Sequence, residues 1–308
     1  MPIYNSARYL SAAIESVLNQ SLSDIEILII DDNSSDGSAE IAASYAERDH
    51  RIRFIRNTPN KGMVANWNYC LELARGDYIK YLFGDDLLSS PDNLKLLAQV
   101  LDDDQSIVLA GSARWNIDEY SNPVNLMDHF GHNRTLAGGD VIRMCLEAQK
   151  NLIGEPTVVI FRKAAAFRGF DLGYRQMVDL EMWLNLLRQG SFAYVSEPLV
   201  SFRIHEEQQT KVNARDMIHL DEMQKLYREY LPHGNLGVLR RGYLGYRQHY
   251  VIWKIYREVG TLGLEQARKK IIRYMPMEKF YFLLPLYKIA TPLWKIIHGI
   301  DKSRQRIS

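Results

Sequence analysis

The sequence lacks the features that mark secreted and membrane-spanning proteins. It contains only two cysteines in 308 residues, too few for a disulfide framework. Cys70 and Cys145 fall on apolar helix faces, where buried free thiols are expected. No uninterrupted apolar run reaches the roughly 18 residues that a spanning helix needs, and no basic segment followed by an apolar one opens the chain. We therefore expect a cytoplasmic protein.

The chain also lacks internal repeats, low-complexity linkers and a large net charge. The formal charge of +1 conceals an asymmetry, because residues 1–205 hold 19 Lys and Arg against 27 Asp and Glu, whereas residues 206–308 hold 19 against 10. A hydrophobic content of 46% is ample for a sizeable core. We expect two parts with different partners, divided near residue 205.

Strand and helix patterns alternate from the start of the chain. The spacing of Leu10, Ile14 and Val17 predicts a helix, with Ser6 as its N-cap. Residues 26–31 form an apolar run of the kind found in strands buried on both faces. The alternation continues with a helix at 36–47, a strand at 51–56, a helix at 63–74 and a strand from residue 78. This rhythm predicts a doubly wound α/β sheet with right-handed crossovers.

The pattern changes further along the chain. We expect a helix with Ser90 as N-cap and Pro91 at its first position, followed by a strand at 107–110 and a long loop at 115–138. After these come a helix at 139–149, a strand at 156–161, a helix at 179–189 and extended segments at 192–195 and 199–204. Beyond residue 206 the pattern is helical, basic and rich in Tyr and Trp.

Two adjacent carboxylates, Asp85 and Asp86, follow the predicted strand that begins at Tyr78. Adjacent like charges need a cation, hydrogen-bond donors or open water to compensate them. A divalent ion with oxygen ligands is one interpretation, and a solvated loop is the other. Open α/β sheets bind their ligands beyond the carboxyl ends of strands, and this position favours a site.

Six short motifs stand in a characteristic order and separation. They are Pro2 to Asn5, Ile30 to Asp36, Asn60 to Ile79, Gly84 to Asp86, Val178 to Leu184 and Phe202 to His205. Over about residues 1–206 the chain resembles the family 2 glycosyltransferases. The resemblance implies a GT-A fold, a Rossmann-like α/β fold with a mostly parallel central sheet, here with a C-terminal helical extension. It also implies a nucleotide-sugar-binding half at about 1–113 and an acceptor half at about 114–205.

The resemblance assigns the donor site to residues from several motifs. Tyr4 and Asp32 would hold the nucleotide base, since an aromatic ring offers a stacking face and a carboxylate accepts the imide N–H of uracil or thymine. Asp32 could instead cap a helix or a turn. Asn66 interrupts an apolar stripe, so it faces either the donor or a partner in the core. The full expected donor set is Pro2, Tyr4, Asp32, Asn66, Asp85 and Arg203.

Asp85, Asp86 and His205 correspond to positions where the family holds Mg²⁺ or Mn²⁺ against the donor diphosphate. A metal held by one or two carboxylates plus phosphate oxygens and water is normal for Mg²⁺. The sequence departs from the family pattern at Phe83, which replaces the first Asp of the Asp-x-Asp region. A lone His after a strand is more often structural, and that interpretation of His205 stays open.

Asp179 aligns with the family's catalytic base, which takes the proton of the acceptor hydroxyl in an inverting transfer. Without the resemblance, a helix-capping role near the positive end of the dipole would be preferred. Val178 replaces the Glu that often precedes the base. Glu155, Pro156 and Thr157 are expected on the acceptor side, again by resemblance.

The first strand has almost nothing before Pro2, although strands are typically about five residues long. Family members carry several β-branched residues there. We therefore expect an upstream start of the reading frame or an abbreviated chain.

Residues 274–300 combine large apolar side chains with lysines every seven to nine residues and with two prolines. Such a segment suits the surface of an anionic membrane, or a helix pair that packs on the catalytic domain. Nucleic-acid binding is disfavoured, because no recognised module frames the basic residues.

The resemblance implies an inverting, metal-dependent glycosyltransferase with a nucleotide-sugar donor. A UDP-sugar is the first candidate donor and a dTDP-sugar the second. The acceptor would be a glycan or a lipid-linked sugar of a bacterial surface polysaccharide, with the protein in the cytoplasm or on the inner face of the plasma membrane. Phe83 and Val178 keep a different class open, an inactive donor-binding homologue that serves as a membrane-associated assembly factor.

Overall fold

The computed structural model describes residues 1–205, 218–233, 264–272, 278, 280–282 and 285. The chain forms two compact units, residues 1–235 and residues 236–308. In the second unit the described helix is α11 (Leu264–Ile272). Most of the predicted basic segment 274–300 lies outside the described residues. None of the described helices combines the length and the apolar character needed to cross a membrane.

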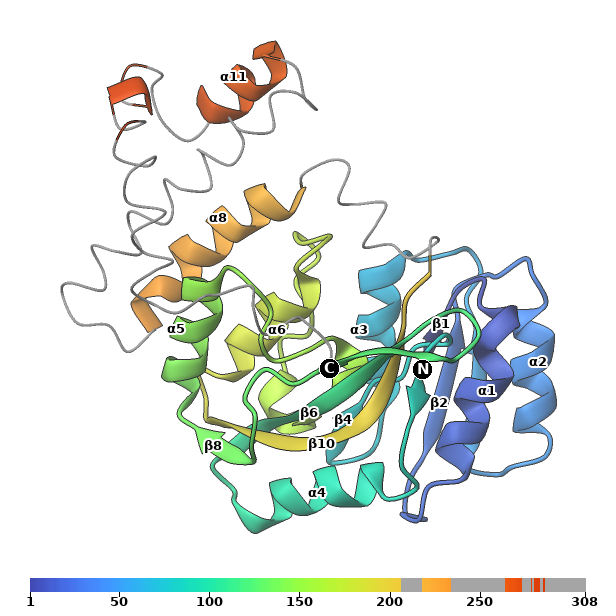
Figure 1. Ribbon diagram of the computed structural model, residues 1–308. Coiled ribbons are helices and arrows are strands. Elements are labelled where there is room, and N and C mark those ends of the chain that lie inside the picture. Colours follow the sequence, from blue (N-terminus) through green and yellow to red (C-terminus); the bar gives the residue numbers. More distant parts are fainter. Residues whose placement is uncertain (206–217, 234–263, 273–277, 279, 283–284, 286–308) are drawn as a thin grey trace. The chain divides into compact units, whose positions relative to one another are not determined.

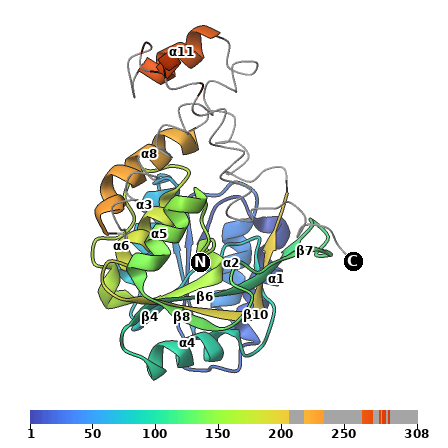
Figure 2. The same ribbon diagram turned by 60° about the vertical axis from the view of Figure 1, so that its left-hand side comes forward.

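A parallel three-stranded sheet opens the first unit, in the order β1 (Pro2–Ile3), β2 (Ile27–Asp31) and β3 (Ile52–Arg56). Helices α1 (Ala7–Leu18) and α2 (Ser38–Ala46) lie on one side of it, and α3 (Met63–Leu73) lies on the other (Figures 1 and 2). These elements confirm the predicted alternation. Ser6 is the N-cap of α1 as expected, but the carboxylate of Asp36 accepts the N–H of Ala7, at 2.9 Å.

The larger sheet is mixed and follows the order β4-β9-β6-β10-β5, with β7 and β8 paired at its margin. The central pair, β6 (Ile107–Ile117) and β10 (Ser191–Arg203), is parallel, and the outer pairs are antiparallel. The remaining strands are β4 (Tyr78–Lys80), β5 (Leu87–Leu88), β7 (Pro123–Met127), β8 (Arg134–Leu136) and β9 (Val159–Arg162). Helix α4 (Asn93–Asp103) covers one face, and α5 (Gly138–Ala148) and α6 (Val178–Leu186) cover the other (Figure 2).

Three sequence predictions are wrong in this region. The predicted loop 115–138 contains the end of β6 and the strands β7 and β8. The predicted strand at 156–161 begins as a 3₁₀ turn, η1 (Pro156–Val158), because proline favours the first position of a helical turn. Helix α4 takes Asp92 as its N-cap rather than Ser90.

Three further segments complete the described part of the first unit. A second 3₁₀ turn, η2 (Lys163–Ala166), follows β9. Helix α8 (Ile218–Tyr230) and η3 (Leu231–His233) come after β10 in the sequence and belong to the same compact unit as the sheets.

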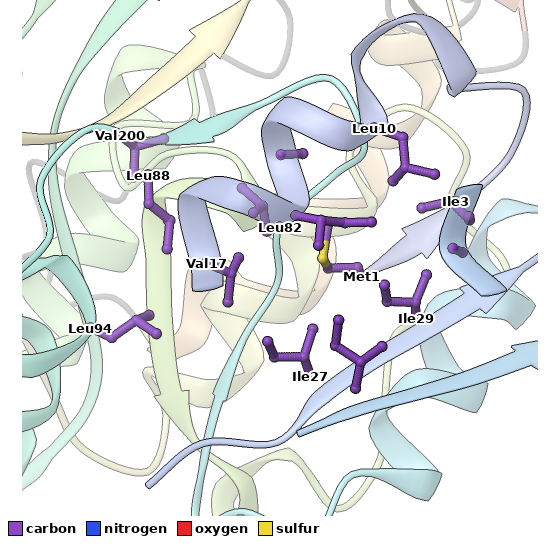
Figure 3. Packing of buried hydrophobic residues seen from close by; sticks show 14 of the residues in the cluster. Met1, Ile3, Leu10, Val17, Ile27, Ile29, Leu82, Leu88, Leu94 and Val200 are labelled. Carbon is purple, nitrogen blue, oxygen red and sulfur yellow. The ribbon is translucent and has the colours of Figure 1, made fainter. Parts of the chain in front are cut away.

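A shared core joins α1 to both sheets. Leu10 and Val17 of α1 meet Ile29 of β2 on one side, and Leu88 and Val200 of the larger sheet contribute to the same cluster (Figure 3). Full burial of each such side chain contributes about 1.5–3 kcal/mol. Both cysteines are buried and free, as predicted. Burial raises the pKa of Cys70 to about 11 and that of Cys145 to about 12.

Strand β1 is two residues long, and β2 and β4 belong to separate sheets. A cavity of about 680 Å³ lies between them, lined by Leu28, Ile79 and Ile160 among others. Its lining includes Glu26 and Asp77, which precede β2 and β4. The cavity therefore reaches the amino ends of these strands, and the polar residues predicted to bind ligands follow the carboxyl ends.

Candidate active site

The carboxyl ends of β1, β2 and β3 bring the first predicted residues together. The parallel register pairs Ile3 with Asp31 and Asp31 with Arg56, so Tyr4 and Asp32 follow neighbouring strand ends. Tyr4 is 58% exposed, which leaves its ring open for stacking. Pro2 is buried inside β1, and its expected contact with the donor stays a prediction.

Asp32 is only 3% exposed, and its carboxylate accepts hydrogen bonds from the chain itself. Oδ1 accepts the N–H of Lys61 at 2.8 Å, and Oδ2 accepts that of Gly62 at 2.9 Å. Because Gly62 is the N-cap of α3, Asp32 holds the loop in front of that helix. Its own turn is stabilised instead by Asp31, which accepts the N–H of Ser34 at 3.1 Å. Asp32 therefore does hold the start of a helix, as the alternative interpretation held, but that helix is α3.

Asn66 lies behind Asp32 as a buried amide with partners. Its Nδ2 donates to the carbonyl of Ile30 at 3.2 Å, and its Oδ1 accepts from Asn57 at 3.0 Å. Asn57 Nδ2 also donates to Asp32 Oδ1, at 2.8 Å. Asn66 is thus connected to the candidate base site through Asn57 and Asp32.

Gly84 brings the two halves of the site together. A Cβ placed on Gly84 would lie 2.5 Å from Ser6 Oγ and 2.8 Å from Ser6 Cβ, closer than real side chains pack. Only glycine permits this approach of the Asp85 loop to the start of α1. The carboxylates at 85 and 86 consequently lie beside the end of β1.

Asp85 and His205 form a partly exposed polar pair at this loop. His205 Nε2 lies 3.0 Å from Asp85 Oδ2, and both side chains reach solvent in part. Arg203 fixes the backbone between them, since its Nε donates to the carbonyl of Asp85 at 2.8 Å and its Nη1 to that of Asp118 at 2.8 Å. Arg203 is 1% exposed. The structure therefore places Arg203, which was predicted to bind the donor, behind Asp85, where it holds the Asp85 backbone.

Asp86 turns away from Asp85 into the protein. Its carboxylate accepts the hydroxyl of Thr157 at 2.6 Å and the backbone N–H of Arg203 at 2.9 Å. Burial, and then the charge of Asp85, raise the pKa of Asp86 well above its ordinary value. Nearby, the Lys80 ammonium donates to the carbonyl of Thr157, and burial lowers the pKa of Lys80 to about 7. The arrangement gives Asp86 a structural role in holding the loop.

Among the residues that the structure describes, no group of three or more His, Cys, Asp or Glu side chains is arranged to hold a metal ion. Asp85 and His205 offer one carboxylate and one imidazole on the same side of the loop. These two ligands, completed by diphosphate oxygens and water, suit Mg²⁺ or Mn²⁺. The residues present therefore fit a metal that arrives with, or is completed by, a phosphorylated ligand.

Asp179 lies in the first turn of α6, with one carboxylate oxygen held on each side. Oδ1 accepts the N–H of Leu180 at 2.7 Å, and Oδ2 accepts the Nδ2 of Asn151 at 2.9 Å. Burial, and then the charge of Glu155, raise the pKa of Asp179 from 3.8 to about 7. A carboxylate with a pKa near neutrality is suited to accept and release a proton.

Glu155 lies near both Asp86 and Asp179, and its charge raises the pKa of each of these carboxyl groups. The guanidinium of Arg114 on β6 holds it, with Nη2 at 2.9 Å from Oε1. Pro156 and Thr157, the other residues predicted on the acceptor side, are buried in η1. Of these three, Glu155 has the side chain that reaches solvent.

An aromatic cluster ties the Asp85 loop to the helix of Asp179. Phe83 stacks on Trp67 with ring centroids 5.1 Å apart, and Trp67 meets Phe170 edge-on at 5.3 Å. Phe170 in turn meets Trp183 of α6 at 6.2 Å. Phe83, which replaces an expected Asp, is therefore a packing residue. Trp183 is part of the core, as predicted.

Three residues of the site were not predicted from the sequence, namely Lys80, Arg114 and Asn151. Lys80 stands in the strand pattern before Asp85, and a single basic residue there looks like a solvated strand end. Arg114 and Asn151 contact partners that are 41 and 28 residues away in the chain. No local pattern reports such pairings.

Comparison with known sequences identifies relatives of this chain. The family model Glycosyl transferase family 2 matches residues 1–168. The uncharacterized protein MT1568 of Mycobacterium tuberculosis is 34% identical over 67% of this chain, and the match spans 66% of that relative, slightly less than two thirds. A putative teichuronic acid biosynthesis glycosyltransferase, TuaG of Bacillus subtilis, is 30% identical over 66% of this chain and 77% of its own length.

Solved structures share the fold. TarS 1–349 of S. aureus, in complex with UDP-GlcNAc, superposes with a TM-score of 0.57 at 16% identity, over 75% of this chain and 70% of that one. The mannosyltransferase PcManGT of Pyrobaculum calidifontis, in complex with GDP-Man and Mn²⁺, gives 0.56 at 13% identity, over 96% and 85%. At these identities the likeness establishes the GT-A architecture that the sequence motifs predicted.

Proposed function

This chain belongs to glycosyl transferase family 2, and we propose that it transfers a sugar from a nucleotide-sugar donor to a glycan or lipid-linked acceptor, with inversion at the anomeric carbon. The observation that carries the proposal is the position of Asp179. Its carboxylate is held by Asn151 and has a pKa raised to about 7. Beside it Glu155 links it electrostatically to the Asp85–Asp86 loop.

The nucleotide base would bind at the carboxyl ends of β1 and β2. The exposed ring of Tyr4 offers a stacking surface. Asp32 Oδ2 accepts one backbone N–H, and a carboxylate oxygen can accept a second hydrogen bond, such as the imide N–H of uracil. The complex of TarS with UDP-GlcNAc supports a UDP-sugar as the first candidate. A dTDP-sugar presents the same imide and is the second.

Asp85 and His205 would hold a divalent cation against the donor diphosphate. When bound, Mg²⁺ or Mn²⁺ would neutralise the negative charge that develops on the departing nucleoside diphosphate. The presence of Mn²⁺ in the PcManGT complex supports divalent metal use. The chain's own part is to orient the two ligands, through Arg203 at the carbonyl of Asp85 and through the close packing of Gly84 on Ser6.

Asp179 would act as the general base. Its ionised carboxylate takes the proton of the acceptor hydroxyl while the hydroxyl oxygen forms a bond to the anomeric carbon. The bond between that carbon and the diphosphate oxygen breaks, and the nucleoside diphosphate departs with the electron pair. Asn151 and the N–H of Leu180 hold the carboxylate in place throughout. Glu155 lies on the acceptor side of the same region.

The acceptor class rests on the relatives. TuaG is named for teichuronic acid biosynthesis, which supports a role in building a bacterial surface polysaccharide. Lipid-linked acceptors lie at membranes, and the basic, aromatic segment 274–300 would suit contact with the inner face of the plasma membrane. The packing of that segment on the catalytic domain is the competing proposal.

The donor site is tested by calorimetric titration of UDP, dTDP and GDP, with and without Mn²⁺. We expect UDP to bind in a metal-dependent manner and Asp85→Ala to abolish that dependence. The variant Asp24→Ala, at an exposed loop before β2, serves as the matched control for loss of an aspartate. Folded protein that binds no nucleotide would overturn the proposed transferase activity. Nucleotide binding without turnover would favour the inactive homologue.

A further inference from the structure

Helix α8 contacts the chain just before the helix that carries Asp179. The carboxylate of Glu222 accepts three consecutive backbone N–H groups. Oε1 accepts that of Arg175 at 2.5 Å, and Oε2 accepts those of Gln176 at 2.9 Å and Met177 at 2.7 Å. Glu222 is 6% exposed, so water competes little for these bonds. Hydrogen bonds to a charged acceptor are stronger than those between neutral groups.

The three N–H groups lead directly into α6. Met177 is the N-cap of that helix, and its carbonyl accepts the N–H of Glu181 at 2.9 Å. The N–H groups at a helix start lack partners within the helix and carry a positive partial charge. The buried carboxylate of Glu222 satisfies the N–H of Met177, which is one of these groups, and also the two N–H groups before it, and so it holds the turn from which the helix begins. Asp179 lies two residues after Met177.

A second contact holds α6 on the other side of Asp179. The hydroxyl of Tyr230, at the end of α8, donates to Oε1 of Glu181 at 2.5 Å, and Arg168 Nη2 donates to Oε2 at 2.6 Å. Glu181 is fully buried. Tyr227 also anchors α8 to α5, because its hydroxyl donates to the carbonyl of Leu146 at 2.6 Å. Helix α8 is thus fastened to the catalytic domain at several points.

We infer that Glu222 is a positioning residue for Asp179, and that α8 belongs to the catalytic apparatus although it follows the region matched by the family model. The inference rests on the proposed role of Asp179 as the base. Glu222 contacts neither Asp179 nor the donor residues in the described structure. It acts through the backbone of residues 175–177, which sets where the first turn of α6 presents its carboxylate.

This role makes a different prediction from simple stabilisation. A stabilising residue that is lost lowers the fraction of folded enzyme, while the folded remainder keeps its turnover number. A positioning residue that is lost lowers kcat in fully folded enzyme and leaves donor binding unchanged, because the donor residues lie on other loops. A misplacement of about 1 Å at a reacting group can cost about 10²-fold in rate.

The experiment uses the full chain with Glu222→Ala, Glu222→Gln and Tyr230→Phe. Arg228→Gln is the control, because Arg228 is an exposed charge on the same helix. Turnover, donor KM and calorimetric UDP affinity are measured well below the lowest melting temperature. We expect Glu222→Ala to lower kcat by about 10- to 100-fold while UDP affinity stays within about twofold. Glu222→Gln keeps one acceptor oxygen, so its kcat should fall between that of Glu222→Ala and the wild type. Arg228→Gln should be unchanged.

The outcomes separate this inference from the proposed function. If Asp179→Asn abolishes transfer and folded Glu222→Ala keeps the wild-type kcat, the positioning role is overturned and the base assignment stands. If Asp179→Asn retains transfer, the proposed function fails first. Should Glu222→Ala not fold, the comparison of Glu222→Gln with Arg228→Gln decides. Equal kcat values for those two variants would reject the inference.

Discussion

His205 Nε2 lies 3.0 Å from Asp85 Oδ2 across 120 residues of sequence. The antiparallel register of β5 and β10 explains the contact, since Leu88 pairs with Val200 and Leu87 with Ser201. If this register is continued, the residues at the end of β10 and just after it lie opposite the Asp85 loop. Asp85 and His205 come from separate motifs and were predicted to bind the same metal. Strand pairing makes them neighbours.

Replacement of His205 tests whether this pair binds a cation. We expect His205→Ala to weaken Mn²⁺-dependent UDP binding by at least about 10- to 100-fold, since even the loss of a group that supports a metal ligand has this cost. UDP binding without metal should change little. The control is His50→Ala, an exposed histidine before β3, at the opposite ends of the strands. Equal Mn²⁺ dependence in His205→Ala and wild type would remove His205 from the metal site.

The raised pKa of Asp179 predicts how transfer responds to pH. The base must be ionised, so kcat/KM should rise with pH through a midpoint near 7 and fall about tenfold per unit below it. The charge of Glu155 contributes to the raised value, and Glu155→Gln removes it. The midpoint of this variant should therefore move to lower pH, whatever happens to its maximal rate. A midpoint that stays in place, or moves to higher pH, would contradict the electrostatic link between the two carboxylates.

The packing of Gly84 on Ser6 predicts a specific rescue. Gly84→Ala should lower the free energy of unfolding by about 1–3 kcal/mol, because the added methyl group overlaps Ser6 Oγ and Cβ. Ser6→Gly removes both atoms, and within the described part of the chain Ser6 Oγ has no hydrogen-bond partner to lose. The double variant should recover part of the loss, measured by denaturant unfolding. Additive costs of the two substitutions would show that the clash is relieved elsewhere.

Regular apolar patterns predicted the first half of the fold. Leu10, Ile14 and Val17 are buried in α1 because a stripe with helical spacing has one way to face a core. The prediction failed where burial does not follow apolar character. Arg114 and Asn116 are buried in β6 through polar partners, so the strand looked like a loop. Strand β7 is mostly exposed and carries little alternation.

The site was predicted as separate motifs, and the structure shows what joins them. Asp85, Asp179 and His205 were recognised because they stand in the motifs that carry the family resemblance. The supporting roles of Asn151, Arg203 and Glu222 were not recognised, because these residues act over distances of 28 to 118 residues. Glu222 also lies in a segment whose net positive charge suggested a membrane surface or a separate region. Long-range hydrogen bonds of this kind leave no periodic signal.

The most direct test of the account is the transfer activity of Asp179→Asn, measured together with UDP binding on the same protein. Asparagine keeps the shape of the side chain and cannot take a proton at neutral pH. The account predicts wild-type UDP affinity and a rate reduced by at least about 10²-fold, the lower range for a general base. Transfer at the wild-type rate by folded Asp179→Asn would contradict the assignment of the base, and with it the central claim.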